Sequence, residues 1–225
     1  MHPMPDFRTE DQYTASGTYV IGIDEVGRGS LAGPVMVGAV CFPLPPDRAS
    51  DLLALGINDS KLKTATARQL LVPRIRERAM AWSIASSDSE CIDRYGITDA
   101  FEDAAFQAVT AVSRMLPRHT PWVVLTDTLT VKRFRQTGIS QHAVLHGDRN
   151  SITIAAASIL AKVERDEYMT TLHQEFSAYN WIKNKGYGTS DHREALRLYG
   201  PTPHHRKLFI RNVLLERSAV GKWQK

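Results

Sequence analysis

Four acidic residues stand at positions where α/β proteins place catalytic groups. Asp24 and Glu25 follow the apolar run 19–23, Asp127 closes the apolar run WVVLT, and Asp166 lies on a long alanine-rich stretch. Acids at the ends of neighbouring strands can converge on one crevice. A charge beside a buried strand is costly unless it is paired or binds a metal. The pattern predicts a metal site, with a helix cap or turn as the alternative for any single acid.

The residue types around these acids indicate a hard cation. Carboxylates without His or Cys partners suit Mg²⁺ or Mn²⁺, and the sequence has no HExxH or CxxC motif for zinc. Such ions often complete their coordination with substrate phosphates. The glycine-rich stretch 27–34 follows the first two acids, and a bridging metal would let the loop and the acids bind one phosphate together. This stretch matches neither a P-loop nor a dinucleotide-binding or nucleophile-elbow pattern.

The elements that must position these groups alternate along the chain. Strands are expected over 20–26, 35–42, 81–88 and 122–127, with a weaker one over 142–148. Helices are expected after Lys63 with a break or kink at Pro73, from a capping box of Asp99 and Glu102, over 151–176, and from 191 onwards. This order predicts an α/β fold with a mixed sheet.

The expected helix over 151–176 has one face of unusual composition. Ala155, Ser158, Lys162 and Asp166 follow at spacings of three, four and four, so they share that face. Its small residues would allow close approach to a sheet, and its charged residues would project beyond the sheet edge. The alternative for Lys162 and Asp166 is an ordinary surface pair.

Composition limits the class of protein. The chain has 225 residues and a formal net charge of +4, and residues 183–225 carry ten Lys or Arg against three acids. This basic segment indicates a polyanionic partner, with a solvated helix as the alternative. The two cysteines form no metal-ligand spacing or disulfide framework, and no apolar run is long enough for a membrane span. We therefore expect a cytoplasmic protein without a membrane partner.

Six ordered blocks resemble the ribonuclease HII family, the type 2 ribonucleases H. They are GIDEVGRGSLAGPV, INDSK, HGD, IAAASILAKVERD, KGYGT and GPTPHHRKLF, and they span the chain from about Tyr19 to Phe209. The resemblance implies a ribonuclease-H-like α/β fold with a central mixed sheet flanked by helices, and a helical C-terminal extension. We expect a flexible tail over 1–18, a catalytic domain over 19–200, and a basic extension over 201–225 packed on or beside it.

The resemblance also implies an activity. A member of this family would hydrolyse RNA in RNA–DNA hybrids and cut 5′ of single ribonucleotides embedded in duplex DNA. Two Mg²⁺ or Mn²⁺ ions would support the reaction, which leaves 3′-hydroxyl and 5′-phosphate ends. Its partners would be hybrids and ribonucleotide-containing duplexes, its roles ribonucleotide removal and RNA primer degradation, and its state a monomer.

Site residues follow block by block from the resemblance. The catalytic and metal-binding acids correspond to Asp24, Glu25, Asp127 and Asp166. The loop that reads the ribonucleotide corresponds to Gly27, Arg28 and Gly29, and the tyrosine that stacks at the junction corresponds to Tyr187. Further substrate contacts are expected from Lys61, Ser158 and Lys162.

The sequence departs from the family pattern at three places, and two other functions stay open. The family usually has glycine at Thr128, DSKKL where this chain has DSKLK, and a continuous helix at Pro73. The alternatives are a nucleic-acid-binding protein that has lost catalysis and a metal-dependent nuclease directed at DNA. All four acids are present, which favours the enzyme.

Overall fold

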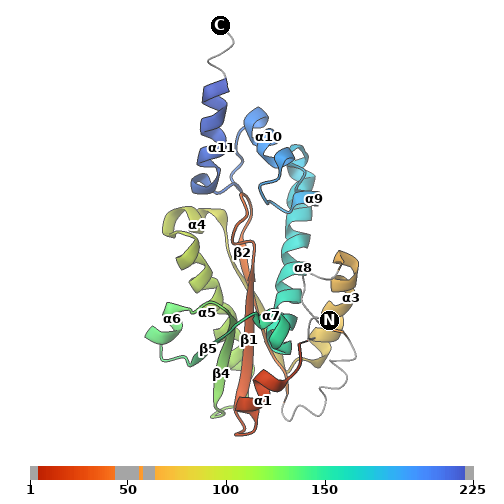
Figure 1. Ribbon diagram of the computed structural model, residues 1–225, viewed down its shortest axis with the longest axis vertical. Helices are drawn as coiled ribbons and strands as arrows, with labels where there is room; N and C mark the ends of the chain where they lie inside the picture. The colour runs from red at the N-terminus through yellow and green to blue at the C-terminus, as the bar shows by residue number, and fades with distance from the viewer. Residues whose placement is uncertain (1–4, 44–55, 58–63, 221–225) are drawn as a thin grey trace. The chain divides into compact units, whose positions relative to one another are not determined.

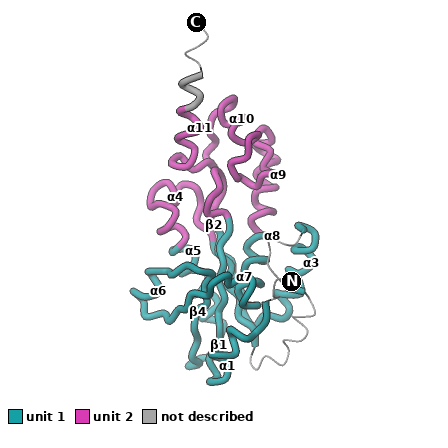
Figure 2. Tube along the Cα trace, viewed as in Figure 1, with its two compact units in different colours: residues 1–26, 36–85, 102–163 teal, residues 27–35, 86–101, 164–225 magenta. Residues whose placement is uncertain are grey.

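The computed structural model describes residues 5–43, 56–57 and 64–220 (Figure 1). They form two compact units, each built from separate segments of the chain (Figure 2). Unit 1 comprises residues 1–26, 36–85 and 102–163, and unit 2 comprises residues 27–35, 86–101 and 164–225. These units cross the predicted boundaries at 18 and 200, so the catalytic domain over 19–200 and the extension over 201–225 stay predictions.

A five-stranded mixed sheet is the centre of unit 1. Its strands are β1 (Tyr19–Val26), β2 (Val35–Cys41), β3 (Ala81–Ser87), β4 (Trp122–Asp127) and β5 (Gln141–Val144). They lie in the order β3-β2-β1-β4-β5, with β1 antiparallel to β2 and parallel to β4, and β4 parallel to β5. The predicted α/β fold with a mixed sheet is confirmed.

Helices account for most of the remaining described residues. They are α1 (Arg8–Thr14), α3 (Ala65–Arg78), α4 (Ser89–Tyr95), α5 (Ile97–Met115), α6 (Lys132–Gln136), α7 (Gly147–Asn150), α8 (Ile152–Glu175), α9 (Trp181–Asn184), α10 (Ser190–Tyr199) and α11 (Lys207–Val220), with a 3₁₀ turn at Ser177–Tyr179. The helix α3 continues through Pro73, so this proline does not end it. Among the described helices, none has both the length and the apolar character that a membrane crossing requires.

The helix α8 packs directly on β1 and β2 because each strand has a glycine at the contact. A Cβ on Gly22 would lie 2.5 Å from the backbone nitrogen of Ile154, and one on Gly38 would lie 2.3 Å from the carbonyl oxygen of Ala157. Both positions therefore exclude any larger residue. The predicted close approach of this helix to the sheet is confirmed. It determines how far from the sheet the next side chains of α8 lie.

The prediction of a flexible tail over 1–18 is wrong for residues 8–14, which form α1. This helix is anchored by Glu10, whose side chain is almost fully buried. Its Oε1 accepts hydrogen bonds from the Ser151 hydroxyl at 2.6 Å, the Thr153 amide at 3.0 Å and the Thr153 hydroxyl at 2.7 Å. Glu10 thus satisfies donors at the first turn of α8, which otherwise have no partner within that helix.

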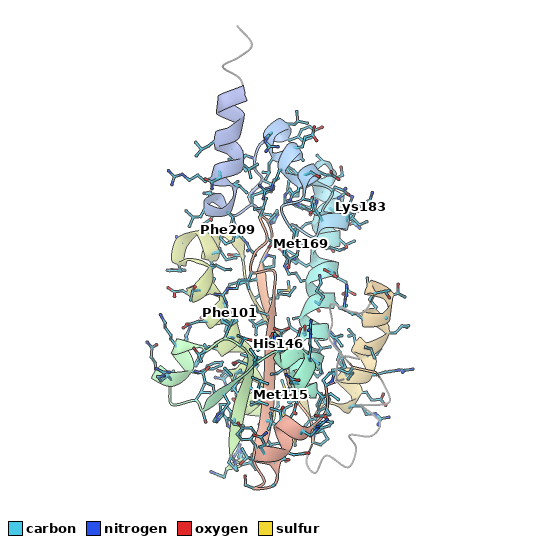
Figure 3. All side chains as sticks on the ribbon, in the orientation of Figure 1. Phe101, Met115, His146, Met169, Lys183 and Phe209 are labelled. Atoms are coloured by element: carbon cyan, nitrogen blue, oxygen red, sulfur yellow. The ribbon has the colours of Figure 1, made fainter. Side chains whose placement is uncertain are left out.

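Two other element predictions needed correction. The helix α5 begins at Ile97, so Asp99 and Glu102 lie inside it and form no capping box. Glu102 instead accepts hydrogen bonds from the amides of Lys132 and Arg133 at the start of α6, at 3.2 and 3.1 Å. The expected strand over 142–148 ends at Val144, because His146 (Figure 3) takes a left-handed φ of 50° immediately before α7.

Unit 2 has its own core, built around aromatic rings. Trp181 is fully buried, and its indole stacks on the ring of Tyr179 with centroids 5.3 Å apart. The indole N–H donates to Nε2 of His192, and the Nε2 atoms of His192 and His205 lie 3.0 Å apart. Buried polar groups need such partners, so these bonds hold α10 and the segment before α11 against the rest of unit 2.

Candidate active site

Asp24 lies on the face of β1 that α8 covers. Successive strand residues alternate between the two faces of a sheet, so Asp24 points to the same side as Gly22, which contacts α8. The hydroxyl of Ser158 on α8 hydrogen-bonds to the Asp24 carboxylate. The amide of Glu25 donates to Oδ1 of Asp24 at 2.9 Å. The carboxylate is therefore held by one donor from the helix and one from the strand.

The fold also opposes the ionisation of Asp24. Burial, followed by the negative charge of Glu25 and then that of Asp127, raises the pKa of Asp24 to about 8, against its ordinary value of 3.8. The hydrogen bonds from Ser158 and from the Glu25 amide lower it only in part. The main physical cause is burial of the carboxylate, to which the like charges of Glu25 and Asp127 add, and a bound cation would oppose both effects.

Asp127 ends β4, which lies beside β1 in parallel register. Ile23 pairs with Thr126, so Asp24 and Asp127 follow at the same level of the two strands. Oδ1 of Asp127 accepts hydrogen bonds from the amide of Gly147 at 2.8 Å and from the Thr128 hydroxyl at 3.0 Å. These two donors fix the orientation of the carboxylate.

The turn after Asp127 shows how the chain accommodates Thr128. This residue has a φ of 56°, in the left-handed region where a β-branched side chain is strained and glycine is not. Its amide donates to the carbonyl of Val144 at 3.0 Å, which ties the turn to β5. Glycine adopts this conformation freely. The departure from the family pattern therefore changes the side chain at this position and keeps a backbone conformation that glycine can also adopt.

The remaining predicted residues of α8 lie one turn apart. Ser158 is buried, while Lys162 and Asp166 are half-buried. Asp166 belongs to unit 2, whereas Asp24, Glu25 and Asp127 belong to unit 1. The assembly of all four acids in one site stays a prediction. Lys61 lies outside the described residues.

The donor atoms of these acids determine which metal they could hold. Within residues 5–43, 56–57 and 64–220, no three His, Cys, Asp or Glu side chains are arranged as a ready metal site. The acids of unit 1 nevertheless fit a hard divalent cation, because their donors are carboxylate oxygens, and burial together with the neighbouring negative charges raises the pKa of Asp24. The predicted two-metal site stays a prediction.

The loop 27–34 is the second predicted element, and within unit 2 it is enclosed by two arginines. The side chains of Arg165 and Arg206 are fully buried. The acceptors of Arg165 are the carbonyls of Pro34, Lys185 and Ala32 and the hydroxyl of Ser30. The acceptors of Arg206 are the carbonyls of Gly27, Arg28 and Gly33. Three other sequence blocks thus hold the glycine-rich block in place.

Close packing explains the glycines of this loop. A Cβ on Gly27 would lie 2.1 Å from Nε of Arg165, and one on Gly33 would lie 2.4 Å from the sulfur of Met169 (Figure 3). Both residues also have a positive φ, 84° and 81°. Larger residues would displace the loop and strain its backbone. The amides of Leu31 and Ala32 both donate to the carbonyl of Gly186, which brings the segment with Tyr187 beside the loop.

Tyr187, the predicted stacking residue, presents its ring at the surface of unit 2. Its side chain is 38% exposed, which is high for a tyrosine in a packed turn. The guanidinium of Arg165 lies 5.5 Å from the ring centroid, a cation–π contact. The Nδ1 atom of His192 lies 2.9 Å from the carbonyl oxygen of Tyr187. The ring thus contacts Arg165 and keeps an exposed part, and its role with substrate stays a prediction.

Arg206 corrects an expectation from the sequence. The basic C-terminal segment suggested that its cations contact phosphates, but Arg206 has no exposed surface and donates to loop carbonyls. Arg165 was not singled out, although a signal was present. It lies on the helical stripe formed with Ala161, Met169 and Leu172, all buried, and a charge on such a stripe must find buried acceptors.

Comparison with known proteins shows the family of the chain. The family model described as Ribonuclease HII matches residues 21–212. The Ribonuclease HII of Ehrlichia chaffeensis is 40% identical over 210 residues, 92% of this chain and 94% of that protein. The Ribonuclease HII of Cereibacter sphaeroides is 40% identical over 220 residues, 96% of this chain and 97% of that protein.

Solved structures share the fold. The ribonuclease H2 from Pyrococcus horikoshii OT3 has a TM-score of 0.71 and 23% identity, covering 89% of this chain and 99% of that one. Bst-RNase HIII in complex with Mn²⁺ has a TM-score of 0.69 and 19% identity, covering 91% and 70%. These structures show the fold, and the family model and the sequence relatives show the family. The chain belongs to the ribonuclease HII family and is a ribonuclease H-type endonuclease, a phosphodiester hydrolase.

Proposed function

We propose that the enzyme hydrolyses the RNA strand of RNA–DNA hybrids and cuts on the 5′ side of single ribonucleotides embedded in duplex DNA. The products would be a DNA 3′-hydroxyl and a 5′-phosphate on the ribonucleotide. This activity would serve ribonucleotide removal and the degradation of RNA primers. The observation that carries the proposal is the Asp24 carboxylate, buried beside two further acids and held at a pKa of about 8.

The acids define the cofactor. Asp24, Glu25, Asp127 and Asp166 would hold two Mg²⁺ or Mn²⁺ ions, and the Mn²⁺ complex of Bst-RNase HIII supports this choice. Metal ions held by these carboxylates would supply a more acidic attacking water and charge stabilisation for the leaving 3′-oxygen.

The side chains around the acids orient them for this task. The hydroxyl of Ser158 donates to Asp24 and so helps to orient this carboxylate, and its contact with substrate stays a prediction. The amide of Gly147 and the hydroxyl of Thr128 both donate to Oδ1 of Asp127. Oδ2 of Asp127 is then the oxygen available to a ligand. Lys162, half-buried one turn after Ser158, would stabilise phosphate charge or orient a carboxylate.

Substrate choice rests on the 2′-hydroxyl, which distinguishes RNA from DNA. The backbone of Gly27, Arg28 and Gly29 would approach the sugar, since glycine leaves room for close contact. The exposed ring of Tyr187 would stack on the sugar or base beside it. Exposed cations of α11 such as Lys207 would contact phosphates of the duplex. A monomeric state and a cytoplasmic location stay predictions.

One assay separates this proposal from its alternatives. A duplex with a single embedded ribonucleotide and the same duplex in all-DNA form are incubated with the enzyme in Mg²⁺ and in Mn²⁺. The proposal predicts cleavage of the first duplex alone. Binding without cleavage would indicate an inactive nucleic-acid-binding protein, and cleavage of both duplexes would indicate a DNA-directed nuclease.

A further inference from the structure

The two buried arginines beneath the loop 27–34 have neutral hydrogen-bond partners. Each acceptor of Arg165 and Arg206 is a carbonyl or a hydroxyl, and within the described residues neither forms an ion pair with a carboxylate. Buried cations normally require a carboxylate partner or pay for their desolvation. Here the loop itself supplies the compensation, through five of its carbonyl groups.

Fixing these carbonyls determines where the amides of the loop are directed. The amides of Ser30, Leu31, Ala32 and Gly33 donate within unit 2, to the carbonyls of Gly27, Gly186 and His204. The amides of Arg28 and Gly29 have no acceptor among the described residues. Gly29 is exposed, and its Cβ position has no atom within 4 Å. Two consecutive backbone donors are thus left for a partner outside the protein.

The arginines also supply charge at this position. Burial, and then the neighbouring charge of Arg165, lowers the pKa of Arg206 to about 9, which still leaves it a cation at neutral pH. The charges of Asp93 and Asp166 act on Arg206 and Arg165 from outside their hydrogen-bond shells and offset them only in part. Two positive charges with neutral hydrogen-bond partners therefore lie under the free amides, and they favour an anionic or hydroxyl-bearing ligand there. Arg165 also contacts the ring of Tyr187, which links the loop to the expected stacking surface.

We propose that Arg206 and Arg165 are positioning residues for ribonucleotide selectivity, because they turn the loop carbonyls inward and so present the amides of Arg28 and Gly29 to a sugar 2′-hydroxyl. Ser30 completes the arrangement, since its hydroxyl accepts from Arg165 and donates to the carbonyl of Gly27 at 2.9 Å. The inference rests on the proposed function and adds the residues that set its specificity.

The test measures selectivity in binding. In an Asp127→Asn background, fluorescence anisotropy gives the Kd for a duplex with one ribonucleotide and for the matched all-DNA duplex. Adding Arg206→Lys should reduce the ratio of the two affinities by about fivefold, the loss of roughly one hydrogen bond, while the all-DNA affinity changes less than twofold. The matched control is Lys207→Gln, the exposed neighbour, which should weaken both duplexes equally and keep the ratio.

A second variant guards against misfolding. Ser30→Ala removes one link between Arg165 and the loop and should lower the ratio by about twofold to threefold, while the protein stays folded with a thermal midpoint lowered by only about 2–4 °C. An unchanged ratio in Ser30→Ala and in folded Arg206→Lys overturns the inference. If the parent binds both duplexes equally while the wild type cleaves only the ribonucleotide duplex, the inference fails and the proposed function stands. If the wild type cleaves neither, the proposed function fails.

Discussion

The charge on Asp24 should make the metal-free enzyme less stable as the pH rises. Its folded pKa of about 8 lies above the ordinary value of 3.8, so between these values the folded state keeps a proton that the unfolded chain has released. Stability therefore falls as the pH increases through this window and levels off above pH 8. Asp24→Asn removes the ionisation while keeping the shape of the side chain, so the variant should not show this fall.

The magnitude follows from the pKa difference. Each pH unit between the two values is worth about 1.36 kcal/mol, so at pH 7 the upper limit is about 4 kcal/mol. Relaxation around the charge reduces this figure, and we expect Asp24→Asn to be about 2–4 kcal/mol more stable than the wild type at pH 7. The gap should narrow towards zero near pH 4.

Urea unfolding in EDTA at pH 5, 6, 7 and 8 measures this gap. Glu77→Gln, an exposed acid of α3, is the control and should give parallel curves for variant and wild type. Millimolar Mg²⁺ should stabilise the wild type and not Asp24→Asn, because the cation binds only the folded form that has its ligand. A gap that stays constant with pH, or a less stable Asp24→Asn, would refute the reasoning.

Other predictions concern single elements. Tyr187→Ala should impair cleavage of a single-ribonucleotide duplex at least as much as that of a continuous hybrid, in steady-state assays, with little change in thermal midpoint because the ring is exposed. Glu10→Ala should lower the unfolding free energy by about 1–3 kcal/mol, since three donors at the start of α8 lose their acceptor; urea titration would show it. Gln at both Lys207 and Arg211 should flatten the salt dependence of binding by about 0.9 per lost phosphate contact. An unchanged slope would assign these cations to solubility.

The strands of the sheet could be predicted from the sequence, because the formation of a strand depends on the local pattern of apolar residues. Apolar runs ended by acids correspond to β1 and β4, and the alanine-rich stretch corresponds to α8. The helix α1 was missed because residues 8–14 are mostly polar. Its anchor, Glu10, accepts a hydrogen bond from Ser151, which lies 141 residues away in the sequence. No local pattern reports such a partner.

The residues of the candidate site likewise include some that local patterns predict and others that depend on distant contacts. The proximity of Asp24, Glu25 and Asp127 could be predicted from their places on two apolar strands, since topology brings those positions to one level, while their catalytic role stays a prediction. The burial of Arg206 could not, because a lone Arg in a basic segment gives no sign of the loop carbonyls that receive it. The left-handed turn at Thr128 could not be predicted either, because threonine seldom adopts this conformation.

Cleavage of an end-labelled duplex with one ribonucleotide tests the central claim most directly. In Mg²⁺ the wild type should cut once on the 5′ side of the ribonucleotide and leave a DNA 3′-hydroxyl, because a deoxyribose at that position has no 2′-hydroxyl to attack the phosphate. Asp127→Asn should bind the same duplex and leave it intact, since it removes a proposed metal ligand. A cut on the 3′ side, a cyclic phosphate product, or near-normal turnover by Asp127→Asn would contradict the account.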